Sequence, residues 1–221
     1  MRPASVLAYL PLAMAVVAGS ATGATLRGRV QLVEKGGKSA GDVEDTVVWV
    51  EGPKVRQKAA TARIEMRNKA FVPRVVVVPV GGTVEFPNDD PVFHNVFSAS
   101  GENRFDLELY KKPKSGSQSF QHPGLVRVYC NIHPQMSAFI LVRDNPYWAR
   151  VGKDGSFAIE GVPNGSWTVK AWHERAGEAA VSATVEGEGT PELVIPLDAS
   201  RFKRAPHKNK FGKDYEAGVS Y

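Results

Sequence analysis

Three side chains with affinity for soft metals follow one another at three-residue spacing: Cys130, His133 and Met136. They supply a thiolate, an imidazole and a thioether within one short stretch. Sulfur suits Cu(I), imidazole suits both oxidation states of copper, and a trigonal plane of two histidines and one cysteine with a long axial methionine imposes an intermediate geometry. This donor set predicts one copper ion that exchanges a single electron with little movement of its ligands.

A second histidine is expected from a different strand, because one compact loop cannot close a trigonal plane around a metal. His94 is the candidate, since it follows a predicted strand at 83–86 and a turn at Asn88-Asp89-Asp90-Pro91. The predicted ligands are therefore His94, Cys130, His133 and Met136. The other histidines are expected at the surface (His122), partly buried with a partner (His173) and in a basic tail (His207).

Other kinds of site fit the sequence less well than copper does. Zinc accepts a cysteine and two histidines, but structural zinc usually fills four strong positions and rarely takes methionine. The adjacent carboxylates Asp89 and Asp90 occupy a turn where Asp is expected for backbone reasons. No serine with a plausible histidine base and no glycine-rich phosphate cradle is evident, so the chain is expected not to be an enzyme.

The elements that must position these ligands are predicted to be β-strands. From Thr25 onward, short runs of β-branched residues are punctuated by Gly, Pro, Asn and Asp, and helical spacing of apolar residues is nearly absent. An all-β protein is expected. The predicted strands are Thr25 to Val33, Thr46 to Glu51, Arg74 to Pro79, Thr83 to Phe86, Gln118 to Phe120, Gly124 to Cys130, Ala138 to Val142, Ser156 to Ile159, Ser166 to His173 and Glu192 to Leu197.

Residues 1–24 have the pattern of a signal peptide: a short basic start, an apolar run at 6–17 and small residues at 18–24. An uncleaved anchor is the alternative. Export is consistent with the single cysteine, Cys130, because a lone thiol in an oxidising compartment calls for burial or metal ligation. We expect a periplasmic protein with no integral membrane segment after cleavage.

The formal charge of +5 is concentrated in residues 54–69 and in the closing segment 200–221. Neither stretch carries a nucleic-acid motif, so nucleic acid is not expected as a partner. The basic residues are interpreted as a solvated surface, with an acidic partner or a membrane surface as the alternative. The closing segment is polar and is expected to be an extended or mobile basic tail.

The stretch from Met66 to Val142 resembles the cupredoxin family, in its plastocyanin and amicyanin-like branch. The matching text is Phe71-Val72-Pro73, Val80 to Asp89, His94-Asn95-Val96, Pro123-Gly124 and the Cys-x-x-His-x-x-Met loop. The resemblance implies a Greek-key β-sandwich and a type 1 copper site. It also implies that Asn95 ties the ligand loops together, that a backbone N–H at Asn131 donates to the sulfur, and that a partly exposed His133 is the exit for electrons. Pro91, Val92, Phe93 and Pro134 are the expected apolar docking patch around it.

The text from Val151 to Val169 resembles the second half of the carboxypeptidase regulatory-like, transthyretin-like β-sandwich. Residues 26–30 and 47–50 match its first half. The expected organisation is a regulatory-like sandwich at 25–59 and 147–199, split by a copper domain at 60–146. Together these parts resemble periplasmic proteins labelled methylamine utilization proteins. The implied function is one-electron transfer with a dehydrogenase or cytochrome partner; the alternative is a copper-handling or assembly protein with copper as cargo or structural ion.

Overall fold

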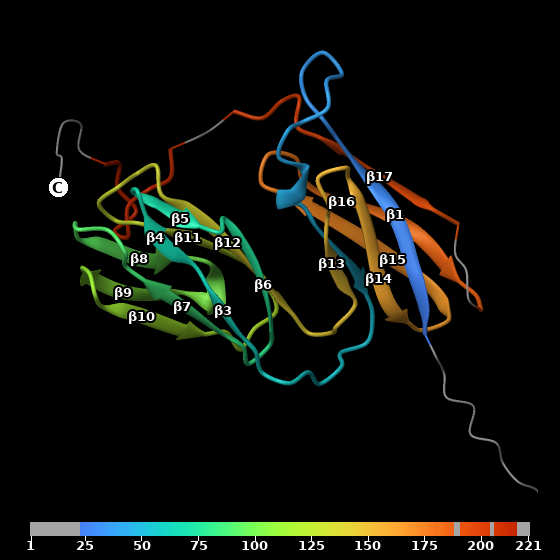
Figure 1. Ribbon diagram of the computed structural model, residues 1–221, viewed down its shortest axis with the longest axis horizontal. Helices are drawn as coiled ribbons and strands as arrows, with labels where there is room; N and C mark the ends of the chain where they lie inside the picture. Colours follow the sequence, from blue (N-terminus) through green and yellow to red (C-terminus); the bar gives the residue numbers. More distant parts are fainter. Residues whose placement is uncertain (1–22, 188–190, 204–205, 216–221) are drawn as a thin grey trace, which may run out of the picture.

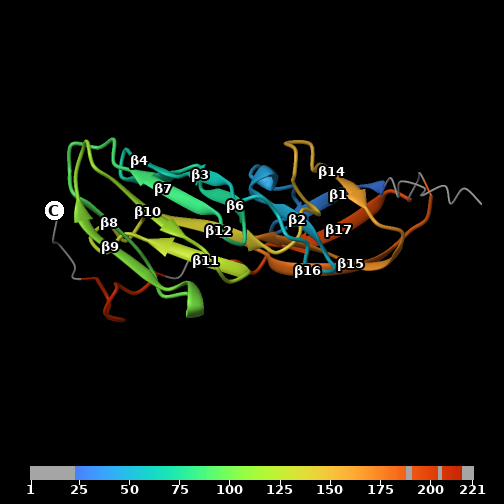
Figure 2. The same cartoon turned by 90° about the horizontal axis from the view of Figure 1, so that it is seen from below.

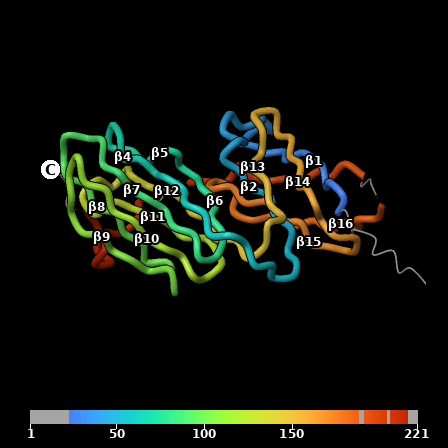
Figure 3. Tube along the Cα trace, turned by 60° about the horizontal axis from the view of Figure 1, so that its bottom comes forward, coloured from blue at the N-terminus to red at the C-terminus, as the bar shows by residue number. Residues whose placement is uncertain are grey.

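The computed structural model describes residues 23–187, 191–203 and 206–215, which form β-strands and loops without an α-helix. The all-β prediction is confirmed. Most of the predicted signal peptide, residues 1–22, lies outside the described residues, as do residues 204–205 and 216–221 of the predicted tail. Within the described ranges, no helix has the length and apolar character needed to cross a membrane. Two lobes lie side by side along the long axis (Figures 1 and 3).

The central lobe holds strands β3 to β12. A five-stranded sheet of order β6-β12-β11-β8-β9 faces a three-stranded sheet of order β10-β7-β3, and β4 and β5 form a separate ribbon (Figure 2). Buried side chains from these strands make one hydrophobic core that includes Cys130 and Met136. The strands are β3 (Thr61–Arg63), β4 (Glu65–Arg67), β5 (Ala70–Val72), β6 (Val75–Pro79), β7 (Thr83–Pro87), β8 (His94–Ser98), β9 (Phe105–Tyr110), β10 (Ser115–Ser119), β11 (Gly124–Tyr129) and β12 (Ser137–Arg143), with a 3₁₀ turn, η2 (Gly101–Asn103).

The terminal lobe combines strands from both ends of the described chain. One sheet has the order β14-β1-β17 and the other β13-β2-β15-β16. Burial alternates along β1, as expected for a strand with one face on a core. The strands are β1 (Ala24–Val33), β2 (Val47–Glu51), β13 (Trp148–Arg150), β14 (Ser156–Val162), β15 (Gly165–His173), β16 (Gly177–Val185) and β17 (Leu193–Asp198), with a 3₁₀ turn, η1 (Val43–Asp45).

The chain enters and leaves the central lobe through two adjacent connections. Val50 N donates to Tyr147 O at 2.9 Å, and Val55 N donates to Asp144 O at 2.9 Å. Strands β1 and β2 then share sheets with strands that follow β12 in sequence. Independent folding of residues 60–146 stays a prediction, which expression of that fragment would check.

A third group of buried side chains joins the lobes. Phe139 and Leu141 point from β12 away from the central core, and Trp172 of β15 meets them, with 5.0 Å between the ring centroids of Phe139 and Trp172. We call this group the interlobe cluster; its members are Val47, Trp49, Val75, Phe139, Leu141 and Trp172. An ion pair from Arg74 to Glu174, at 2.6 Å, borders it. Both faces of β12 are therefore buried, which explains its unbroken apolar run.

Candidate metal centre

The sheet topology brings the predicted ligands to one end of the central lobe. His94 opens β8, whereas Cys130 directly follows β11. These two strands are antiparallel, with Tyr129 opposite Phe97, so the start of one lies beside the end of the other. His133 and Met136 occupy the turn between β11 and β12, which we call the ligand turn (residues 130–136).

The side-chain donors of His94, Cys130 and His133 lie within 4.8 Å of one another, and all three residues are buried. The Nδ1 atoms of His94 and His133 are 3.0 Å apart, and Cys130 Sγ lies 3.7 Å from His133 Nδ1. Metal bonds of about 2.0 Å to nitrogen and 2.3 Å to sulfur place donors of one shell roughly 3–4 Å apart. The arrangement therefore fits a metal held between two imidazoles and a thiolate.

The ligand turn is closed by its own backbone. Met136 N donates to His133 O at 3.0 Å, and Cys130 N donates to Met136 O at 3.3 Å. The Met136 side chain is 1% exposed and belongs to the same core as Cys130. A thioether and a thiol are thus buried in the same core at the ligand turn, a pair of sulfur donors that suits a soft metal such as copper better than zinc.

No family model matches the chain, and no curated protein sequence matches it. Among solved structures, a purple cupredoxin from Nitrosopumilus maritimus is similar at 24% identity and a TM-score of 0.34, over 37% of this chain and 99% of that one. Amicyanin from Paracoccus versutus is similar at 23% identity and a TM-score of 0.35, over 43% of this chain and 97% of that one.

Asp90 fixes the orientation of His94. Its carboxylate Oδ2 lies 2.7 Å from His94 Nε2, and both side chains are buried. A carboxylate only accepts, so Nε2 carries the proton and Nδ1 presents its lone pair toward His133 and Cys130. A carboxylate behind a ligating histidine commonly sets the ring orientation and raises its basicity. The sequence reading assigned Asp90 a turn role only and missed this one.

The Asp90 carboxylate is itself held by backbone donors. Asn68 N and Lys69 N donate to Oδ1 and Oδ2 at 2.7 and 2.8 Å, from residues with positive φ of 55° and 53°. Burial alone would raise the pKa of Asp90, but the N–H groups of Lys69 and Asn68 and the His94 ring together hold it below its usual value. Asp90 is therefore a carboxylate, as its acceptor role requires.

We expect Asp90→Asn to weaken metal binding by about 10-fold to 100-fold, the usual effect of losing a group behind a ligand. The amide offers one acceptor where the carboxylate offers two, and its NH₂ group opposes the backbone donors. Competition with a chelator measures the change. Asp89→Asn is the matched control, since it removes the same charge from an exposed neighbour. Equal affinities for the two variants would contradict the role of Asp90.

The Cys130 sulfur lies in a dry environment with few donors. Burial raises the pKa of the Cys130 thiol, while the N–H groups of Asn95, Ile132 and His133 act in the opposite direction. Asn95 N donates to Sγ at 3.5 Å. Among the described residues, no positive charge contributes to the pKa of the thiol, which stays protonated at neutral pH, so metal binding must release that proton.

Asn95 and Asn131 join the two ligand-bearing segments, in a pattern that differs in one respect from the expectation. The Asn131 backbone N–H donates to Asn95 Oδ1 at 3.2 Å. The Asn131 N–H was expected to donate to the Cys130 sulfur, but the Asn95 backbone N–H makes that hydrogen bond instead. The Asn95 side chain also donates to Asp106 Oδ1 at 2.7 Å and to Glu108 O at 3.0 Å.

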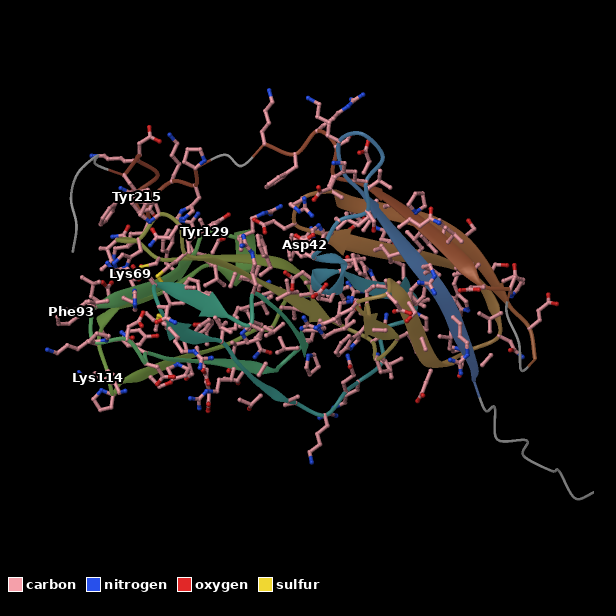
Figure 4. The ribbon with its side chains drawn as sticks, turned by 45° about the horizontal axis from the view of Figure 1, so that its top comes forward. Asp42, Lys69, Phe93, Lys114, Tyr129 and Tyr215 are labelled. Carbon is pink, nitrogen blue, oxygen red and sulfur yellow. The ribbon has the colours of Figure 1, made fainter. Side chains whose placement is uncertain are left out.

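The expectation of a partly exposed His133 is wrong, because this residue is only 5% exposed. In the predicted docking patch, Phe93 is 49% exposed, Pro91 and Pro134 are exposed and Val92 is half-buried. Phe93 stands at the outer end of the central lobe (Figure 4). The patch stays a prediction.

The remaining histidines are not members of the donor cluster. His122 is at the surface near Glu102, 3.5 Å away. His173 is buried in the terminal lobe, where its Nδ1 accepts from Arg175 N at 3.2 Å. His207 does not hang free in a tail but stacks on Tyr129 at 4.0 Å.

Proposed function

We propose that the chain binds one copper ion through His94, Cys130, His133 and Met136, and that it transfers single electrons between redox proteins. The observation that carries this proposal is the convergence of two imidazole Nδ1 atoms and one thiol, all buried and within 4.8 Å. Copper held by such donors supplies a reversible one-electron couple.

The residues of the chain contribute rigidity and exclusion of water. Asp90 holds His94 in one tautomer at 2.7 Å, and the Asn95 side chain accepts from the Asn131 backbone at 3.2 Å. The ligand turn carries its own backbone hydrogen bonds. Donors that are fixed before the metal arrives need little rearrangement when the charge of the site changes, which favours rapid electron exchange.

Electron transfer is favoured over a copper-handling function by the enclosure of the donors. His94, Cys130 and Met136 are at most 1% exposed, and His133 is 5% exposed. Handing a metal to another protein requires an incoming ligand to reach it, and buried donors oppose that exchange. Rapid, reversible electron exchange without copper loss supports the proposal, whereas ready transfer of Cu(I) to an acceptor protein supports the alternative.

In the proposed setting the mature chain is periplasmic, is not an enzyme, and receives electrons from a dehydrogenase or cytochrome. The signal-peptide pattern of residues 1–24 and the single cysteine support export. Fractionation of a bacterium that expresses the full chain, with immunodetection of each fraction, tests the location. A chain found only in the cytoplasm would contradict it.

The visible and electron paramagnetic resonance spectra of the protein after addition of Cu(II), with the copper content per chain, test the binding proposal. An intense thiolate-to-copper band at one copper per chain is expected. A colourless protein that binds zinc in preference would contradict it.

We expect Met136→Ala to keep copper bound but to shift its reduction potential and its spectrum. The axial thioether bond is weak, so the two imidazoles and the thiolate still hold the ion, while loss of the fourth donor changes the relative stability of the two oxidation states. Voltammetry measures the shift. Met66→Ala is a control, because Met66 is also buried in the central core but lies on β4. A shift of the same size in Met66→Ala would contradict the axial assignment.

A further inference from the structure

The described end of the chain returns from the terminal lobe and lies against the metal centre. After β17 the chain crosses to the central lobe, where residues 206–215 pack beside the ligand turn (Figures 1 and 2). Pro206 and His207 face Pro134 and Gln135 of that turn across a small cavity. We call residues 206–215 the C-terminal strap.

Tyr215 contacts a predicted ligand residue directly. Its hydroxyl donates to the Cys130 backbone carbonyl at 2.7 Å, and it also lies 3.2 Å from His207 Nδ1. His207 Nδ1 is 3.0 Å from Lys208 O, an acceptor, so Nδ1 carries the proton. The Cys130 carbonyl oxygen can only accept, so the Tyr215 hydroxyl donates its proton to Cys130. The direction of the hydrogen bond to the ligand residue is fixed.

Three aromatic rings hold this hydroxyl in place. The His207 ring stacks on Tyr129, with 4.0 Å between centroids and 18° between planes. Tyr215 meets His207 edge-on, at 5.2 Å and 88°. Tyr129 directly precedes Cys130. The C-terminal strap therefore contacts two successive residues, Tyr129 through the His207 ring and Cys130 through the Tyr215 hydroxyl.

Lys210 completes a ring of hydrogen bonds that connects the C-terminal strap to the segments that carry His94 and Cys130. Its backbone N donates to Asn131 Oδ1 at 2.9 Å, and its ammonium group contacts Asp106 Oδ2 at 2.6 Å. Asp106 accepts from Asn95, and Asn95 accepts from the Asn131 backbone. The ring Lys210–Asp106–Asn95–Asn131 therefore links the strap to the residues next to both His94 and Cys130.

We propose that Tyr215 is a positioning residue of the metal centre, and that the C-terminal strap holds the ligand turn in place through Tyr215 and Lys210. The consequence for copper rests on the proposed function, but the restraint on the turn does not. The polar composition of this segment predicts an extended or mobile tail; its contacts instead assign it to the site.

The restraint is tested first on the metal-free full-length protein by hydrogen exchange. Tyr215→Phe keeps the ring and removes only the hydroxyl, so the Cys130 carbonyl loses a donor. We expect the hydrogen bond from Tyr215 to stabilise the closed ligand turn by the usual net amount for one hydrogen bond. Its loss is therefore expected to speed exchange about fivefold to tenfold at the amides of Cys130, Asn131 and Met136. Lys210→Met, which keeps the stem of the side chain, is expected to speed exchange at Asn131.

Tyr147→Phe is the matched control, since Tyr147 packs against the core of the terminal lobe. It is expected to leave these three amides unchanged. Unchanged exchange in both Tyr215→Phe and Lys210→Met would overturn the proposal, whether or not the protein binds copper.

The copper-loaded protein supplies a second readout that packing alone would not move. Without the hydroxyl, the positive end of its O–H dipole no longer lies beside the Cys130 peptide, and the more negative surroundings of the thiolate favour Cu(II). Tyr215→Phe is therefore expected to lower the reduction potential and to speed copper loss to a chelator about fivefold to tenfold. A potential equal to that of Tyr147→Phe would overturn the positioning role. A wild-type chain that takes up no copper would instead overturn the proposed function and leave the exchange result standing.

Discussion

Cys130→Ser is expected to abolish the intense visible band of the copper-loaded protein. That band requires a thiolate bonded to copper, and the serine hydroxyl is a hard donor that stays protonated at neutral pH. Cys130 is the single cysteine, so no other thiol can take its place. Absorption and electron paramagnetic resonance spectra after addition of Cu(II) measure the loss, and copper analysis shows whether the remaining donors retain any ion.

Two comparisons make this result specific. Far-ultraviolet circular dichroism should show that Cys130→Ser remains folded, because serine is slightly smaller than cysteine and the site is buried. His122→Ala should leave the band unchanged, since His122 lies at the surface beside Glu102. A thiolate-type band that survives in Cys130→Ser would contradict the assignment of the ligand.

The candidate site was predictable to the extent that its donors are local. Cys130, His133 and Met136 lie within one turn, so their proximity follows from sequence spacing alone. His94 required the further assumption that two strands meet, which the antiparallel pairing of β8 and β11 satisfies. Asp90 was missed because turn chemistry is a sufficient reason for an Asp at that position. Only the fold shows that its carboxylate also reaches His94.

The strands were predictable where one face is buried and the pattern alternates, as in β1 and β7. Among the missed strands, β9 carries this signal in Phe105-Asp106-Leu107-Glu108-Leu109, whereas β10 lacks it. Residues 115–119, predicted only in part as β10, read Ser-Gly-Ser-Gln-Ser, and β16 opens with glycine and alanines, which favour strands weakly. In β9 the positive φ of Glu108, 58°, interrupts the alternation. These segments form strands because their neighbours pair with them.

The C-terminal strap shows a different limit of sequence reasoning. Its composition is basic and polar, which is typical of mobile tails. A few directed contacts, from His207, Lys210 and Tyr215, are enough to place it on the ligand turn. Composition averages over a segment, whereas the position of this one depends on three side chains whose partners are some 80 to 105 residues away in sequence.

The interlobe cluster likewise could not be read from sequence. The run Ala138 to Val142 predicts a strand, and β12 is that strand, but a continuous apolar run does not say what covers each face. In the structure Ile140 packs into the central core, while Phe139 packs against Trp172 of the terminal lobe. Energetic coupling of the lobes follows from this arrangement.

Trp172→Ala is expected to lower the free energy of unfolding by about 3–5 kcal/mol, the usual range for removal of a large buried aromatic side chain. Trp172 is 6% exposed and lies 5.0 Å from the ring of Phe139, so its loss opens a cavity between the lobes. Urea denaturation followed by circular dichroism measures the change. Because Phe139 lies on β12, which leads directly out of the ligand turn, the copper-bound form should lose stability as well.

Phe93→Ala, at a side chain 49% exposed, is the control and should change stability far less. If Trp172→Ala lowered the free energy of unfolding by less than about 1 kcal/mol, the interlobe cluster would not couple the lobes. Each lobe would then be stable without the contacts of Trp172.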